Sequence, residues 1–282
     1  MSAATDTAAR GASRSERPLL QVDDLTKHFA ISGGAFGRKR SVVQAVDRVS
    51  FEVKAGETLG IVGESGCGKS TTARLIMNLI EPDAGSVSFG GQRIGGPEGI
   101  AHRTLYRQMQ MVFQDSYASL NPRMPLSMCV AFGPMVQGLP KREAMERAAD
   151  LLARVGLDPV HYANRYGHEL SGGQRQRVNI ARALALQPRL VVLDEAVSAL
   201  DVSIRAQILD LLASLSIRLG ISYLFISHDL SVVRSITDRV LVMREGRIVE
   251  EGTTEEVFLA PKHAYTKMLI AATPILKEPA EA

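Results

Sequence analysis

Short apolar runs recur along this chain of 282 residues, and polar or glycine residues follow them. The clearest runs are 58–62, 111–113, 189–194 and 221–227, and runs of this length with such boundaries are typical of buried strands. Segments with apolar residues at helical spacing lie between them, for example 141–155. The alternation of strands and helices predicts an α/β fold with a mostly parallel sheet.

Two parts of the chain follow other patterns. Alternating positions in 19–29 and 42–53 predict a first strand and one or two returning strands, and 86–94 and 239–251 predict hairpins. An antiparallel β part is therefore expected near the N-terminus. In contrast, 115–170 shows no strand pattern, which predicts an α-helical subdomain inserted into the core.

The predicted organisation is one large domain between two tails. Residues 1–17 are small, polar and dotted with arginine, so we expect a disordered tail there. The domain is predicted over 18–270, with the helical subdomain at about 115–173, and a C-terminal tail over 271–282.

Composition excludes several classes of protein. The net charge of +3 does not indicate a nucleic-acid binder, and no apolar run reaches the ~18 residues of a membrane span. The N-terminus lacks the apolar core of a signal peptide. Cys67 and Cys129 form no metal-ligand cluster, and a disulfide at Cys67 would distort the loop that holds it. We therefore expect a soluble or peripheral protein on the cytoplasmic side.

A glycine-rich segment, GESGCGKS, occupies 63–70 directly after the strand 58–62. It fits the pattern G-x-x-x-x-G-K-[ST] of a phosphate-binding loop. A helical pattern follows it, with apolar residues that we expect on one helix. These are Leu75, Ile76, Leu79 and Ile80. Strand, loop and helix are the context that the motif requires, so a chance match is a poor alternative.

The residue types of this loop explain the chemistry. Glycines let the backbone N–H groups converge on a phosphate, and the helix adds its positive end. Lys69 can reach the β- and γ-phosphates, and the Ser70 hydroxyl can ligate Mg²⁺. The predicted nucleotide ligands are Gly63, Glu64, Ser65, Gly66, Cys67, Gly68, Lys69, Ser70 and Thr71.

Two acids, Asp194 and Glu195, end the strand 189–194. Beside a phosphate loop, Asp194 can hold Mg²⁺ and Glu195 can polarise a water in line with the γ-phosphate. Acids end many strands, so this interpretation depends on the phosphate loop.

The segment LSGGQ at 170–174 begins another predicted helix. The Ser171 hydroxyl with the amides of Gly172 and Gly173 can form a second anion site. The alternative is an ordinary N-cap, with Ser171 capping the helix. One chain with one triphosphate needs one such site, whereas two chains arranged head to tail would each use both.

These motifs together resemble the ATP-binding subunit of ABC transporters. GESGCGKS, Gln114, LSGGQ, LVVLDE, SALD and His228 occur in this order within about 19–275. The segments KHF, FQDSYASLNPRM, DEAVSALDVSIRAQ, SHDLSVVR and PKHAYTKMLIAATP resemble the dipeptide/oligopeptide importers. That subfamily also includes importers of nickel, glutathione and some sugars.

The resemblance implies roles for particular residues. Phe29 would stack on adenine, with plain core packing as the alternative. Gln114 would contact Mg²⁺ and the attacking water, and Glu195 would be the general base. His228 would contact the γ-phosphate, with a capping or core histidine as the alternative. Asp201 would cross the interface between two subunits, and Gln174 belongs to the second anion site.

The resemblance also implies a P-loop NTPase fold of the ABC ATPase type and an activity. The chain would hydrolyse ATP with Mg²⁺ to power peptide import at the cytoplasmic face of the inner membrane. Its partners would be transmembrane permease subunits, a second ATP-binding subunit and, indirectly, a solute-binding protein, with no nucleic acid. A soluble ABC ATPase without a transport partner, a P-loop kinase or GTPase, and an importer of another solute remain alternatives. The residues leave open the cargo, the direction of transport and whether the two subunits are identical.

Overall fold

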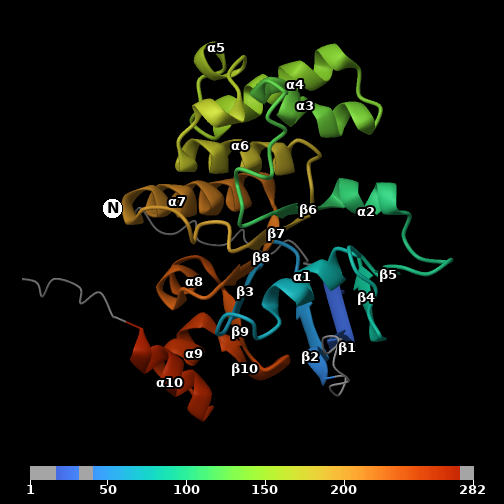
Figure 1. Cartoon of the computed structure of the whole chain (residues 1–282), viewed down its shortest axis with the longest axis vertical. Coiled ribbons are helices and arrows are strands. Elements are labelled where there is room, and N and C mark those ends of the chain that lie inside the picture. The colour runs from blue at the N-terminus through green and yellow to red at the C-terminus, as the bar shows by residue number, and fades with distance from the viewer. Residues whose placement is uncertain (1–16, 32–40, 274–282) are drawn as a thin grey trace, which may run out of the picture.

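The computed structural model describes residues 17–31 and 41–273, which form two β-sheets flanked by helices (Figure 1). The predicted N-terminal tail, the loop between the first two strands and most of the predicted C-terminal tail lie outside these residues.

The larger sheet has the strand order β10-β9-β3-β8-β7-β6. Five strands are parallel and β10 pairs antiparallel with β9, so the mostly parallel sheet is confirmed. Every residue of β3, β7 and β8 is buried, as continuous apolar runs predict. The strands are β3 (Thr58–Val62), β6 (Met109–Val112), β7 (Leu190–Asp194), β8 (Ser222–Ser227), β9 (Arg239–Arg244) and β10 (Arg247–Thr253).

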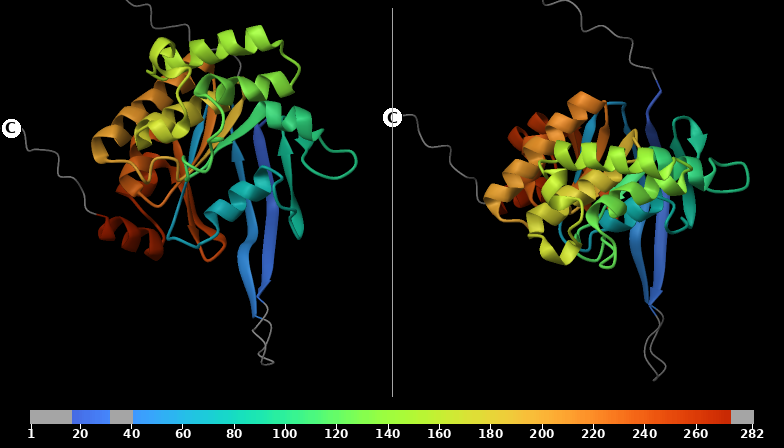
Figure 2. Two further views of the ribbon diagram at one scale, coloured as in Figure 1. Left: turned by 45° about the horizontal axis from the view of Figure 1, so that its top comes forward. Right: turned by 90° about the horizontal axis from the view of Figure 1, so that it is seen from above.

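The smaller sheet is antiparallel, in the order β2-β1-β4-β5, and confirms the expected N-terminal β part. A single long strand returns after the first one, and both extend away from the helices (Figure 2). The strands are β1 (Leu20–Ile31), β2 (Ser41–Val53), β4 (Ala84–Phe89) and β5 (Gln92–Arg93).

Helices cover the larger sheet from two ends of the molecule. In Figure 1, α3, α4 and α5 lie at the top above α6, and α8, α9 and α10 lie at the bottom. The helices are α1 (Lys69–Ile76), α2 (His102–Gln108), α3 (Leu126–Val136), α4 (Lys141–Arg154), α5 (Pro159–Tyr162), η1 (Gly167–Glu169), α6 (Gly172–Leu184), α7 (Val202–Leu219), α8 (Leu230–Ile236), α9 (Thr254–Leu259) and α10 (Ala264–Ala272).

The segment 115–170 is helical in its regular elements, with one isolated bridge between Pro125 and Tyr166. The boundaries predicted for this subdomain stay a prediction, because its residues share one core with the larger sheet. None of the helices within 17–31 and 41–273 is both long enough and apolar enough to cross a membrane.

Two predicted boundaries are wrong. The helix α1 ends at Ile76, so Leu79 and Ile80 do not belong to it. Asn78 turns the chain with a left-handed φ of 54°, and Leu79 N–H donates back to the Arg74 carbonyl at 2.9 Å. The strand predicted at 111–113 runs over Met109–Val112, and Phe113 lies beyond it with 41% of its surface exposed.

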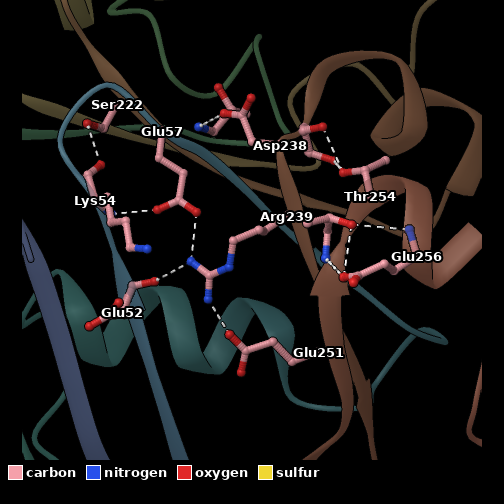
Figure 3. Close-up of polar contacts among 12 residues, drawn as sticks. Glu52, Lys54, Glu57, Ser222, Asp238, Arg239, Glu251, Thr254 and Glu256 are labelled. Atoms are coloured by element: carbon pink, nitrogen blue, oxygen red, sulfur yellow. Dashed lines mark hydrogen bonds and ion pairs between the residues drawn. The ribbon is translucent and has the colours of Figure 1, made fainter. Parts of the chain in front are cut away.

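Arg239, the first residue of β9, joins strands of both sheets (Figure 3). Its Nη1 donates to Oε1 of the buried Glu57 at 2.7 Å and to the Glu52 carbonyl on β2 at 3.5 Å. Its Nη2 pairs with Glu251 of β10. One guanidinium therefore links the start of β3, the strand β2 and the edge strand β10.

Candidate nucleotide site

Neighbouring parallel strands carry the candidate residues to one edge of the larger sheet. The loop 63–70 follows β3, Asp194 ends β7, and His228 follows β8. Gln114 lies two residues beyond β6. The carboxyl ends of parallel strands meet at one edge, which is where open α/β sheets bind ligands.

The phosphate loop needs glycine because other backbone passes close to it. A Cβ on Gly68 would lie 2.1 Å from the Ala45 carbonyl oxygen, and φ at Gly68 is 109°. A Cβ on Gly63 would lie 2.1 Å from the Met243 carbonyl oxygen. Side chains larger than hydrogen would therefore displace β2 or β9 from the loop.

Lys69 lies under the loop and is 4% exposed. Its Nζ donates to the carbonyl oxygens of Gly63 and Glu64, at 2.8 Å each. The same ammonium lies 3.7 Å from the Cys67 thiol, and burial raises the pKa of that thiol. Cys67 therefore stays protonated at neutral pH.

Ser70 and Asp194 form a pair of oxygen ligands suited to Mg²⁺. The Ser70 Oγ donates to Oδ1 of Asp194 at 2.9 Å. Burial raises the pKa of Asp194, and the charge of Glu195 adds to the rise, while the Ser70 hydrogen bond opposes it. A hydroxyl beside a buried carboxylate fits a hard cation that prefers oxygen.

Glu195 lies between Gln114 and His228. Its Oε2 accepts from Nε2 of Gln114 at 3.1 Å, and its Oε1 lies 3.3 Å from Nδ1 of His228. The backbone of Glu195 has a left-handed φ of 49°, which is unusual for a residue with a side chain. Two polar partners thus hold this carboxylate, and rare backbone conformations of this kind cluster at functional sites.

A cavity of about 500 Å³ joins these groups. Three residues of the phosphate loop, Glu195 with its two polar partners, and two leucines line it. The lining residues are Gly63, Glu64, Ser65, Gln114, Glu195, His228, Leu230 and Leu269.

The LSGGQ segment does not line this cavity. Ser171 is the N-cap of α6, where its Oγ accepts from Gln174 N–H at 3.3 Å, as the alternative interpretation expected. The Gln174 side chain completes a capping box and also donates to the Tyr162 hydroxyl at 3.0 Å. Gly172 and Gly173 form the first turn of the helix and leave its N-terminus accessible.

Two other predicted residues are exposed. Phe29 is 41% exposed, so the alternative of core packing is wrong. It pairs with Val43, two residues before the Ala45 carbonyl that borders Gly68. Asp201 is the exposed N-cap residue of α7, with no side-chain cap bond.

Sequence reasoning missed Arg205 and Asp229. The Nη1 of Arg205 donates to Oδ2 of Asp229 at 2.7 Å, and its Nη2 donates to the Leu200 carbonyl at 3.0 Å. Asp229 follows His228 and caps α8 through the N–H groups of Ser231 and Val232. The available signal was the charge of Arg205, which lies four residues after Asp201 at the start of a predicted helix. No pattern in the sequence indicated that Arg205 pairs with Asp229.

Sequence reasoning also missed Tyr265 of α10. Its hydroxyl accepts from the Glu64 N–H at 3.2 Å, and Leu269 of the same helix lines the cavity. The segment PKHAYTKMLIAATP contains both residues, but it was singled out only for its resemblance to the dipeptide/oligopeptide importers.

Comparison with known proteins agrees with this geometry. The family model for ABC transporters matches residues 46–198, and the model for the oligopeptide/dipeptide transporter C-terminal region matches 249–282. A probable peptide ABC transporter ATP-binding protein of Sinorhizobium fredii is 53% identical over 266 residues, which are 94% of this chain and 74% of that protein.

A glutathione import ATP-binding protein of Pectobacterium atrosepticum is 52% identical over 259 residues, or 92% of this chain. This chain spans 41% of that protein's length.

Solved structures share the fold. CbiO1 of Clostridium perfringens, described as part of an ABC transporter complex, has a TM-score of 0.74 and 30% identity over 87% of this chain and 92% of its own. A dimeric ATP-binding cassette in a post-hydrolysis state with ADP and Pi has a TM-score of 0.70 and 26% identity, over 83% of this chain and 98% of its own. The sequence, the fold and these matches show that the chain belongs to the ABC transporter family.

Proposed function

We propose that this chain is an ATP-hydrolysing subunit that powers the import of peptides across the inner membrane. It acts from the cytoplasmic face with transmembrane permease subunits, and a solute-binding protein delivers the cargo to them. Two ATP-binding subunits, identical or paralogous, face each other head to tail. Each phosphate loop then receives its ATP against the LSGGQ segment of the other subunit.

Different residues of the chain bind ATP, activate water and contact the partner subunits. The N–H groups of the loop 63–70 and the Lys69 ammonium bind the phosphates, and Phe29 stacks on adenine. Gln114 and His228 hold the Glu195 carboxylate so that it accepts a proton from water. Asp201 and Ser171 act across the subunit interface, and the helical segment 115–173 transmits closure to a permease.

Ser70, Gln114 and Asp194 would hold Mg²⁺, which when bound neutralises charge on the phosphate oxygens. The Ser70–Asp194 contact and the buried carboxylate support this assignment.

One observation carries the proposal. The cavity contains the loop, Gln114, Glu195 and His228, while LSGGQ lies elsewhere with its helix N-terminus accessible. A protomer with every group for water activation and an anion site outside its own cavity needs a neighbour to complete the site. Closure is then driven by contacts to the γ-phosphate that exist only between two protomers.

The test is Glu195→Gln, with Glu245→Gln as the matched control. Both glutamates have a left-handed φ, 49° and 48°, but Glu245 is exposed on the β9–β10 turn. We expect Glu195→Gln to bind ATP, to lose turnover by at least ~100-fold, and to form a closed dimer with ATP in light scattering. The control should turn over ATP at the wild-type rate.

The dependence of the ATPase rate on protein concentration provides a second test. The rate per wild-type subunit should rise with protein concentration, because a composite site forms only in a dimer. A rate near wild type in Glu195→Gln, or full activity in a monomer, would contradict the proposal.

Glutathione is a second candidate cargo, because a glutathione import protein is 52% identical. Substrate-stimulated ATPase of the subunit reconstituted with its permease, measured with a set of peptides and with glutathione, separates the two. Failure to co-purify with any permease would favour a soluble ABC ATPase instead.

A further inference from the structure

The C-terminal helix α10 touches the phosphate loop through one tyrosine. The Tyr265 hydroxyl accepts a hydrogen bond from the backbone N–H of Glu64 at 3.2 Å, across 201 residues of chain. Tyr265 is 3% exposed, and it is one of two buried residues in this helix of nine. The contact therefore fixes α10 and the second residue of the loop to each other.

Strands of the larger sheet hold Tyr265 in place. The Arg244 guanidinium, at the end of β9, lies 5.0 Å from the centre of the tyrosine ring. The N–H groups of Lys262 and His263 donate to the Glu250 carboxylate on β10, at 2.7 and 3.0 Å. His263 Nδ1 in turn accepts from Tyr265 N–H at 3.2 Å and caps the helix. The hydroxyl is thus positioned by β9 and β10, next to the strand that leads into the loop.

The Glu64 residue is held from two sides. Its N–H donates to Tyr265, and its carbonyl accepts from Lys69 Nζ at 2.8 Å. Loss of the tyrosine hydroxyl would leave the Glu64 N–H without this acceptor and free the Gly63–Glu64 peptide to rotate, and its carbonyl, that of Gly63, also accepts from Lys69. That rotation would disturb one of the two carbonyls that orient the Lys69 ammonium.

A second residue of α10 reaches the same place. Leu269 lies one helical turn after Tyr265 and lines the cavity that contains Glu195 and His228. The helix therefore contributes an apolar wall to the cavity as well as a hydrogen bond to the loop.

We propose that Tyr265 is a positioning residue for ATP binding. Its hydroxyl fixes the Gly63–Glu64 peptide, and through it the loop and Lys69, while Leu269 forms one wall of the cavity. This inference rests on the proposed function. It gives the segment that matches the oligopeptide/dipeptide C-terminal region, 249–282, a role at the nucleotide site rather than at the cargo.

The test compares Tyr265→Phe with Tyr223→Phe in the full chain. Each change removes one hydroxyl from a buried ring, but the Tyr223 hydroxyl has no hydrogen-bond partner among the described residues. Three quantities are measured: deuterium exchange of peptides that contain Glu64, the Kd of a fluorescent ATP analogue, and the thermal midpoint.

For Tyr265→Phe we expect faster exchange around Glu64 and a rise in Kd of about 3- to 10-fold, the range of one net hydrogen bond. KM for ATP should rise in parallel while kcat changes less than about twofold, because the hydroxyl orients the binding loop and not the attacking water. Tyr223→Phe should match wild type in all of these, and both variants should unfold within a few degrees of it.

Glu250→Gln provides a second variant, because it weakens the start of α10 without touching the loop. It should shift exchange and Kd in the same direction by a smaller factor. Exchange and Kd equal to wild type in Tyr265→Phe would overturn the inference while the proposed function stands. A wild-type protein that fails to bind the analogue would overturn the proposed function and the role of Tyr265 with it.

Discussion

The Ser70 hydroxyl donates a hydrogen bond to Asp194 Oδ1 across 2.9 Å, although 124 residues separate them. The contact exists because β8 lies between β3 and β7 in the sheet, so the residues after β3 and at the end of β7 share one edge. Burial raises the pKa of Asp194, which makes the carboxylate costly to hold without a cation or donor beside it. The Ser70–Asp194 contact gives the sharpest test of the proposed metal site.

Asp194→Asn should strongly reduce the increase in ATP affinity that Mg²⁺ gives. Asparagine keeps an oxygen that accepts from Ser70 but removes the charge that would hold the cation. In excess EDTA we expect the variant to bind ATP with the wild-type affinity. The increase in ATP affinity on adding Mg²⁺ should be about tenfold or more smaller than in wild type. Fluorescence titration with and without Mg²⁺ measures both, and an undiminished gain would refute the ligand assignment.

Substitutions of Ser171 can separate its N-cap role from the role that we propose for it at a partner's phosphate. Ser171→Ala removes the cap of α6 and should lower the unfolding free energy by about 1 kcal/mol. Ser171→Asp keeps a good cap but places a carboxylate where a partner's phosphate would bind, so stability should hold while turnover collapses. Urea unfolding and ATPase rates measure the two effects. Wild-type turnover in Ser171→Asp would leave Ser171 as a cap and nothing more.

Gly68→Ala should destabilise the loop more than Gly66→Ala does. Both glycines have left-handed φ values, 109° and 81°, so each alanine costs about 1–2 kcal/mol in backbone strain. The two glycines differ in the space around them. A Cβ on Gly68 would lie 2.1 Å from the Ala45 carbonyl oxygen, whereas a Cβ on Gly66 would have no neighbour within 4 Å. Equal unfolding free energies in nucleotide-free urea titrations would argue against this packing.

Asp229 should make stability depend on acid pH. Burial works to raise its pKa, but hydrogen bonds from Ser231 and Val232 and the charge of Arg205 hold that pKa below its ordinary value. A lowered folded pKa means that the stabilisation is complete above the unfolded pKa of about 4 and is lost as the pH falls through the folded value. Asp229→Asn should therefore destabilise at pH 7, by a margin that shrinks below pH ~4.

Asp210→Asn is the control for this effect, because Asp210 is exposed on the same helix as Arg205. Unfolding free energies of wild type and both variants between pH 7 and 3 give the comparison. A margin for Asp229→Asn that is constant with pH would show that its charge is not the source.

The strands of the larger sheet were predictable because their signal is local. A run such as 190–193 is apolar throughout since both faces of its strand are covered, and all of its residues are buried. The residues at the ends of such strands converge at one edge of the sheet. Strand pattern alone singled out Asp194, whereas the expected roles of Gln114 and His228 came from the resemblance.

Other features depend on contacts that the local pattern does not encode. The end of α1 is decided by a left-handed Asn78, whereas Leu79 and Ile80 continue the helical spacing beyond it. The unusual φ of Glu195 arises where β7 ends, and no residue type signals it. The bond between Tyr265 and Glu64 requires β9 and β10 to be placed first.

Arg239 has a consequence for how the molecule would move. Its bonds to Glu57, Glu251 and the Glu52 carbonyl tie β2 to the strand that feeds the phosphate loop. No hinge can open between the two sheets at this point without stripping a partly buried guanidinium of its partners. We therefore expect the antiparallel sheet, with Phe29 on β1, and the phosphate loop to move together as one unit.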